Sequence, residues 1–253
     1  MERNDIGKLV IITGVTQGLG RAMVDRFHEL GWNIAGCGRS KNKIEELNKY
    51  YGASHDFQII DVSNHHQVSK WASRILNKYR APDMLINNAS IVNQNAPLWK
   101  VTAQEFESVM SVNVNGVVNV IRAFVPAMIA RKEGIIINMS SSWGREGEAE
   151  LAPYCASKFA VEGITQSMAM ELPNGMAVVA LDPGGSISTP MLHLCAPQYV
   201  KESPTPEMWS HKAIHYILNI SIDKNGESLT CPAYIHWETP CQKERLKGAF
   251  LYY

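Results

Sequence analysis

The sequence predicts an α/β fold: a single domain built on a doubly wound parallel sheet of about seven strands flanked by helices. Short β-branched runs such as residues 8–13, Lys-Leu-Val-Ile-Ile-Thr, alternate with longer helical segments that often end at a glycine. A continuous apolar run suits a strand buried on both faces, as in a parallel sheet. No repeat, low-complexity tract or Pro/Gly/Ser-rich linker divides the chain, so one domain over residues 1–253 is expected.

Each expected element follows from this alternation. The strands are the apolar runs at residues 8–13, 33–37, 57–60, 83–87, 134–139 and 176–181, with a weaker run at 228–234. The helices cover residues 18–30, 41–51, 102–131, 152–172 and 207–220, and a further one follows Asn64 and ends near Arg80. Residues 183–206 form a long loop with several prolines. Such a sheet binds ligands at the carboxyl ends of its strands, near the switch in strand order.

The composition argues against several classes of function. Lys plus Arg and Asp plus Glu both total 24, and this balance argues against nucleic acid as a partner. No apolar run reaches the roughly 18 residues of a membrane span, and the polar N-terminus leads directly into the first strand, so no membrane segment or signal peptide is expected. The five cysteines are scattered, without Cys-x-x-Cys, which indicates a reducing, cytoplasmic compartment and no metal site.

Tyr154 and Lys158 form a Tyr-x-x-x-Lys pair in the predicted helix 152–172. Residues four apart lie on one face of a helix, so the phenol and the ammonium meet. A free Tyr has a pKa of about 10, and a nearby fixed cation stabilises the phenolate and lowers that pKa. The pair is therefore a candidate proton donor with the group that tunes it. Taken alone, the spacing favours the alternative of an accidental surface pair.

A glycine turn, Gly14-x-x-x-Gly18-x-Gly20, joins the first strand to the first helix. Glycines allow a tight turn and a close approach of the backbone, so that the helix N-terminus can receive a pyrophosphate. The spacing differs from the common Gly-x-Gly-x-x-Gly of dinucleotide sites and lacks the Gly-Lys-Ser/Thr of a P-loop. A glycine-rich turn without a ligand is the alternative.

Arg39 follows the second predicted strand, where a dinucleotide site for NAD has an acid that binds the ribose 2′-hydroxyl. A carboxylate there would repel the 2′-phosphate of NADP, whereas an arginine can pair with it. The sequence therefore favours NADP over NAD as cofactor. The alternative is an arginine that only faces solvent.

Together these motifs resemble the short-chain dehydrogenase/reductase family, in its order and spacing, from residue 8 to about residue 191. Besides the glycine turn and the Tyr-Lys pair, they include Asn87-Asn88-Ala89, Asn113 in Val-Asn-Val-Asn-Gly, Ser141 and Pro183-Gly184. Within the family, residues 134–145, 152–158 and 175–184 look like the NADPH-dependent pterin aldehyde reductases of plants. The resemblance implies a Rossmann-type fold, reduction of a small-molecule carbonyl to an alcohol by hydride transfer, and a homo-oligomer, either a dimer or a tetramer.

The resemblance also implies four catalytic residues. Tyr154 would protonate the carbonyl oxygen, and Lys158 would lower the pKa of Tyr154 and bind the nicotinamide ribose. Ser141 would hold the substrate oxygen, and Asn113 would hold a water that links Lys158 to solvent. The family's precedent gives these roles; the spacing of the residues does not.

The implied substrate site lies among Ser141, Trp143 and Tyr154. Ser140 and Ser142 flank Ser141 and are the alternative assignments. Trp143 either borders the pocket or belongs to the core. Residues 184–206 would form the loop that covers the substrate.

The implied cofactor site follows the carboxyl ends of the strands. The glycine turn would line the phosphates, residues 61–62 the adenine, residues 87–89 the adenosine ribose and residues 183–189 the nicotinamide. In the last of these stretches, either Ser188 or Thr189 would supply the hydroxyl. The full set is Gly14, Thr16, Gln17, Gly18, Leu19, Gly20, Arg39, Asp61, Val62, Asn87, Ala89, Tyr154, Lys158, Pro183, Gly184, Ile187 and Thr189.

Two other functions compete with carbonyl reduction. A non-catalytic dinucleotide-binding sensor could use the same fold, but it would not need all four catalytic residues. A sugar-nucleotide epimerase of the longer related class would need a substrate domain, for which the chain is too short. Ser90 departs from the family, which usually has glycine there, and residues 238–253 match no pattern. The sequence specifies neither the physiological substrate nor the direction of the reaction.

Overall fold

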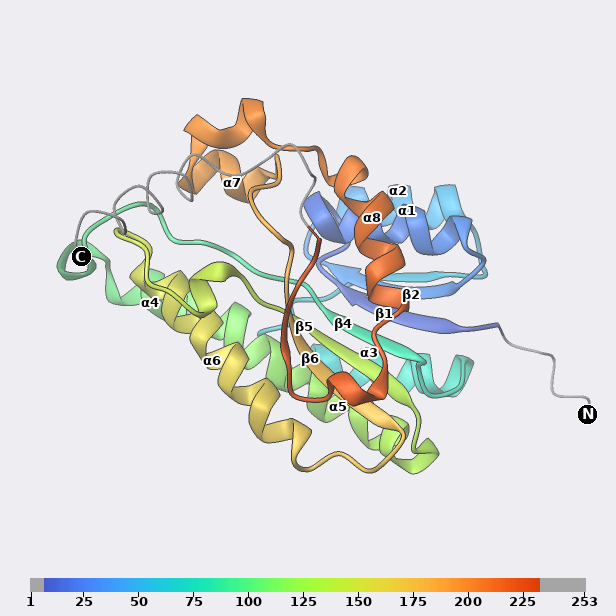
Figure 1. Ribbon diagram of the computed structural model, residues 1–253. Helices are drawn as coiled ribbons and strands as arrows, with labels where there is room; N and C mark the ends of the chain where they lie inside the picture. The colour runs from blue at the N-terminus through green and yellow to red at the C-terminus, as the bar shows by residue number, and fades with distance from the viewer. Residues whose placement is uncertain (1–6, 233–253) are drawn as a thin grey trace, which may run out of the picture.

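The computed structural model describes residues 7–232, which form one seven-stranded sheet in the order β3-β2-β1-β4-β5-β6-β7 (Figure 1). Every neighbouring pair of strands is parallel. The strands are β1 (Leu9–Thr13), β2 (Asn33–Gly38), β3 (Asp56–Ile59), β4 (Met84–Asn87), β5 (Gly134–Met139), β6 (Met176–Asp182) and β7 (Ser228–Thr230). The predicted fold class is confirmed.

Helices cover both faces of this sheet (Figure 1). One face carries α1 (Gly18–Glu29), α2 (Lys41–Tyr51) and α8 (Pro206–Leu218). The other carries α3 (His65–Lys78), α5 (Gly116–Arg131) and α6 (Ala152–Ala169), with α4 (Ala103–Met110) packed against α6.

The two faces explain why the first strand is apolar throughout. All five residues of β1 are buried. Val10 and Ile12 belong to the core on the α1 side, and Leu9 and Ile11 belong to the core on the α3 side. Since side chains alternate across a strand, a strand covered on both faces needs apolar residues at every position.

The predicted helix 102–131 is interrupted in the structure. A π-helical turn, Ser111–Asn115, separates α4 from α5. The stretch Ala103–Arg131 is long and apolar enough to span a membrane by length and composition, which the sequence analysis did not anticipate. Val120 and Phe124 on this stretch are buried in the core beneath the sheet, as in the core helix of a globular protein.

The predicted loop 183–206 is partly helical. It contains α7 (Pro190–Cys195), capped by the Thr189 side chain, and a 3-10 segment at Pro197–Glu202. The last strand, predicted as 228–234, ends at Thr230. The predicted end of that strand and residues 238–253 lie outside the described residues.

The strand order reverses beside β1. The chain runs from β1 outward to β2 and β3, then returns to β4 on the other side of β1. The loops that leave the carboxyl ends of β1 and β4 therefore diverge, and a crevice opens between them. Both ends carry predicted site residues.

Candidate active site

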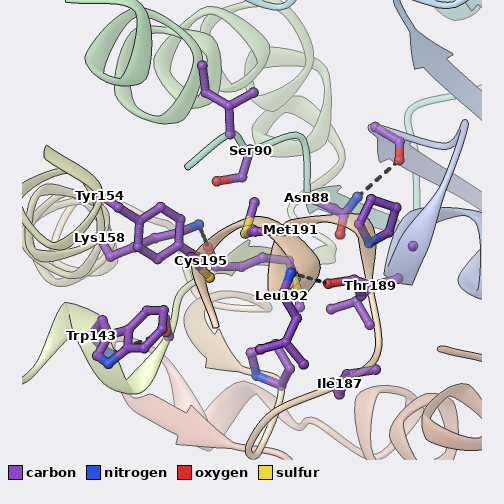
Figure 2. Close-up of a pocket in the computed structure, with 18 of the residues that line it drawn as sticks. Asn88, Ser90, Trp143, Tyr154, Lys158, Ile187, Thr189, Met191, Leu192 and Cys195 are labelled. Atoms are coloured by element: carbon purple, nitrogen blue, oxygen red, sulfur yellow. Dashed lines mark hydrogen bonds between the residues drawn. The ribbon is translucent and has the colours of Figure 1, made fainter. Parts of the chain in front are cut away.

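A cavity of about 1390 Å³ runs along these carboxyl ends (Figure 2). Small-ligand pockets are commonly about 300–1,000 Å³, so this one has room for a dinucleotide together with a small substrate. Most of the predicted site residues line it, namely Gly14, Thr16, Gln17, Gly18, Leu19, Arg39, Asp61, Val62, Ala89, Ser141, Trp143, Tyr154, Lys158, Pro183, Gly184, Ile187 and Thr189.

Gly20, Asn87 and Asn113 were expected at the site but are not in the lining. A Cβ on Gly20 would lie 2.2 Å from the Gly14 carbonyl oxygen, so this glycine lets α1 pack against the turn. The Asn87 amide is buried in the sheet, where its Nδ2 donates to Asn138 Oδ1 at 2.8 Å. The next residue, Asn88, lines the cavity instead.

Asn113 lies in the π-helical turn, and its amide is fully engaged. Its Oδ1 accepts from Ile91 N at 2.8 Å, and its Nδ2 donates to the Ile91 carbonyl at 2.8 Å and to Ser157 Oγ at 3.0 Å. The side chain thus holds the loop after β4 against α6. A water-holding role for Asn113 stays a prediction.

The glycine turn forms a cradle at the start of α1. Gly14 has φ +74, and a Cβ there would lie 2.9 Å from Ala89 Cα, so only glycine fits this approach. The N-cap of α1, Gln17, makes no side-chain cap, which leaves the first N–H groups of the helix without an intramolecular side-chain partner. Such a helix start suits a pyrophosphate.

Two residues outside the predicted set brace this cradle. Thr13 Oγ1 accepts from the backbone N–H groups of Asn88 and Ala89, both at 2.9 Å. Asn88 Nδ2 donates to the Thr13 carbonyl at 2.8 Å, a bond drawn in Figure 2. The Thr-Gly and Asn-Asn-Ala motifs are far apart in the sequence, and the pairing of β1 with β4 brings them together.

Arg39 is exposed at the end of β2, in the lining of the cavity. A second cation lies close by, because Lys43 Nζ on the first turn of α2 donates to Gln17 Oε1 at 3.2 Å. The sequence analysis missed Lys43. Its signal was its place in the first turn of the helix that follows Arg39, where a side chain can reach back over the strand ends.

Tyr154 and Lys158 meet at the other end of the cavity, as the four-residue spacing predicts. Lys158 Nζ lies 5.4 Å from the centroid of the Tyr154 ring and donates to the Met139 carbonyl at 2.8 Å (Figure 2). Tyr154 is 6% exposed and Lys158 is 4% exposed. The pair is therefore buried, which excludes the accidental surface pair.

Burial dominates the electrostatics of this pair. Burial lowers the pKa of Lys158 to about 8, against the opposing effects of the Glu162 and Asp182 carboxylates. Burial raises the pKa of the Tyr154 phenol above its usual value, and a hydrogen bond with Ser141 acts in the opposite direction. The expected lowering of the Tyr154 pKa is thus not the net effect in the structure.

The three consecutive serines have different surroundings. Ser141 bonds to Tyr154, and its Oγ also accepts from Trp143 N at 3.2 Å. Ser140 is buried and donates to Glu162 Oε1 at 2.5 Å, whereas Ser142 is exposed. Of the three, Ser141 is the one that faces the phenol.

This geometry predicts unequal effects for two alanine variants. Ser141→Ala should lower kcat by about 10²-fold or more, as the loss of one donor to a developing oxyanion does. Ser142→Ala should leave kcat near the wild-type value. Steady-state kinetics of both variants on one aldehyde tests this, and a larger loss for Ser142→Ala would show that the assignment is one residue out of register.

Trp143 borders the pocket rather than the main core. Its ring lies 6.0 Å from the Tyr154 ring in an edge-on arrangement and lines the cavity beside it (Figure 2). Its indole Nε1 donates to Glu148 Oε2 at 3.1 Å. The acidic segment after Ser141 therefore folds back over the pocket.

Arg145 fixes that segment to the sheet. Its Nη2 pairs with Asp182 Oδ2 at 2.6 Å, and its Nη1 donates to Ser228 Oγ at 3.0 Å. The sequence suggested a solvated charge, but the guanidinium joins the ends of β6 and β7 to the loop after β5. Thr189 lines the cavity while Ser188 does not, which decides between the two hydroxyls of that stretch.

Comparisons with known proteins place this geometry in a family. The short chain dehydrogenase family matches residues 8–199. The NADPH-dependent pterin aldehyde reductase of Arabidopsis thaliana is 44% identical over 225 residues, which cover 88% of this chain and 93% of that protein. The 3-oxoacyl-[acyl-carrier-protein] reductase of Thermotoga maritima is 33% identical and covers 73% of this chain and 76% of its own length.

A solved structure agrees with the sequence relatives. The 3-ketoacyl-(acyl-carrier-protein) reductase of Brucella melitensis, complexed with NADH, has a TM-score of 0.80 and 26% identity, covering 88% of this chain and 96% of its own. The family match, the identity to these relatives and the shared fold lead to one conclusion. The chain belongs to the short chain dehydrogenase family and is an NAD(P)-dependent oxidoreductase of that family.

Proposed function

We propose that the protein reduces an aldehyde or ketone to an alcohol with NADPH, and that Tyr154 donates the proton. One observation carries this proposal. The Tyr154 phenol, the Ser141 hydroxyl and the Lys158 ammonium converge at one end of a cavity whose other end is the cradle of the glycine turn.

The residues of the chain divide the chemistry among them. NADPH would supply the hydride to the carbonyl carbon. The Ser141 hydroxyl would donate to the carbonyl oxygen as negative charge develops there. The raised pKa of Tyr154 keeps its phenol protonated at neutral pH, as a proton donor must be. Lys158 would stabilise the phenolate left behind and hydrogen-bond the nicotinamide ribose.

The preference for NADPH rests on charge at the adenosine end. Arg39 and Lys43 put two cations at the rim, where an NAD site would have an acid. The Arabidopsis relative at 44% identity is named as NADPH-dependent. The glycine cradle and the uncapped start of α1 fit the pyrophosphate of the same cofactor.

The proposed substrate is a pterin aldehyde, the substrate in the name of that relative. Residues 184–206 would cover the substrate, since α7 and the segment that follows it line the same cavity as Tyr154. We also propose a homo-oligomer, either a dimer or a tetramer. The α6 helix leaves Phe159 48% exposed, and such an apolar surface could pack against a second copy.

An NADPH-oxidation screen tests the proposal. Purified protein is assayed with 6-formylpterin, benzaldehyde, aliphatic aldehydes and ketones, and NADPH binding is measured in parallel by fluorescence. We expect turnover, with the highest kcat/KM on 6-formylpterin. If NADPH bound and no carbonyl were reduced, the non-catalytic sensor would be the better hypothesis.

A further inference from the structure

The substrate end of the cavity has mainly apolar walls. A small cluster of buried residues forms them, with Trp143 and Tyr199 packed against it: Leu151, Cys155, Leu192, Cys195 and Ala196. Figure 2 shows Leu192 and Cys195 on the segment after β6, across from Tyr154 and Trp143. Such walls suit the faces of a flat ring, but they do not fix which edge of the ring points where.

Glu148 is the carboxylate that this pocket holds in a defined place. It is half-buried, it lines the cavity, and the Trp143 indole donates to its Oε2 at 3.1 Å. Its backbone is fixed as well, because its carbonyl accepts from Leu151 N at 3.3 Å. A carboxylate has about four acceptor positions, so one indole N–H leaves it able to accept from a ligand.

The position of Glu148 relative to the reacting groups is also defined. The Trp143 ring contacts the Tyr154 ring on one side, with centroids 6.0 Å apart, and bonds to Glu148 through its Nε1. The carboxylate is thus one indole away from the proposed proton donor. A ligand of two fused rings can place a carbonyl at Tyr154 and its far edge at Glu148.

We infer that Glu148 determines substrate specificity by binding two adjacent N–H donors on the far edge of a flat heterocycle. This inference rests on the proposed function, because a pterin carries those donors as its ring N3–H and its 2-amino group. The pair matches a carboxylate as a guanidinium does, with two parallel charge-assisted hydrogen bonds. An aldehyde without such donors gains nothing from Glu148, and an anionic aldehyde is repelled by it.

A pair of ligands isolates this contact. Binding of 6-hydroxymethylpterin and of 6-hydroxymethyllumazine, in which a carbonyl replaces the 2-amino group, is measured by ligand fluorescence on the protein saturated with NADP⁺. The wild type should bind the pterin about 10- to 100-fold more tightly than the lumazine. Glu148→Gln keeps an acceptor for Trp143 but loses the charge, so it should weaken pterin binding and remove most of the preference.

Two controls separate the possible causes. Glu171→Gln makes the same change of charge on an exposed residue outside the cavity lining, and it should keep the wild-type preference. The KM of Glu148→Gln for benzaldehyde should also stay near the wild-type value, because a displaced Trp143 would change it. Equal binding of the two ligands by the wild type, or an equal loss on both in Glu148→Gln, would overturn the inference. Lack of turnover of 6-formylpterin would instead count against the proposed function, since the binding measurement needs no turnover.

Discussion

Replacing Tyr154 with phenylalanine should lower kcat for aldehyde reduction by about 10²- to 10⁴-fold, the usual contribution of a positioned general acid. The ring would keep its packing against Trp143 and beneath Lys158, since only the hydroxyl is lost. The Kd for NADPH should therefore stay close to that of the wild type. Stopped-flow or steady-state kinetics together with a fluorescence titration of NADPH measure the two effects separately.

A tyrosine far from the cavity is the matched control. Tyr216 on α8 is not in the cavity lining, so Tyr216→Phe should leave both kcat and the Kd unchanged. Retention of kcat by Tyr154→Phe would refute the assigned role. A parallel loss of NADPH affinity would instead indicate that the phenol holds the cofactor.

Arg39→Ala should raise the Kd for NADPH by about 10- to 100-fold and leave the Kd for NADH nearly unchanged. The guanidinium would lose charge-assisted hydrogen bonds to the 2′-phosphate, and each tenfold change corresponds to about 1.4 kcal/mol. NADH has no such phosphate, so the ratio of the two constants should fall by the same factor. Titrations with both cofactors at fixed ionic strength measure this ratio, because exposed charges are screened by salt.

Arg122 provides the comparison for this variant. It is exposed on α5 and outside the cavity lining, so Arg122→Ala should affect neither cofactor. An equal loss of NADPH and NADH binding in Arg39→Ala would contradict recognition of the 2′-phosphate.

Most of the fold follows from patterns that are local in sequence. The buried run of β1, the glycine after the first helix and the Thr102 cap each mark an element without reference to any other. The Tyr-x-x-x-Lys pair is likewise local, since the helix itself brings Tyr154 and Lys158 to one face. These features could be predicted because the periodicity of one element determines them.

Other features depend on contacts between distant segments. The π-helical turn at Asn113 exists because the loop after β4 and α6 both bond to that side chain. Lys43 reaches the cofactor rim only because β1 and β2 are neighbours in the sheet. Asn87 points into the sheet because the β4–β5 register sets it opposite Asn138. No window of the sequence contains both partners of these contacts.

The amide of Asn113 behaves towards Ile91 as a neighbouring strand would, accepting from its N–H and donating to its carbonyl. Aspartate or leucine cannot make both bonds, so one buried backbone group would lose its partner. The architecture therefore demands asparagine here whether or not the protein turns over a substrate. Asn113 is thus no evidence for catalysis, and the case against a purely regulatory binder of dinucleotides depends on Ser141, Tyr154 and Lys158.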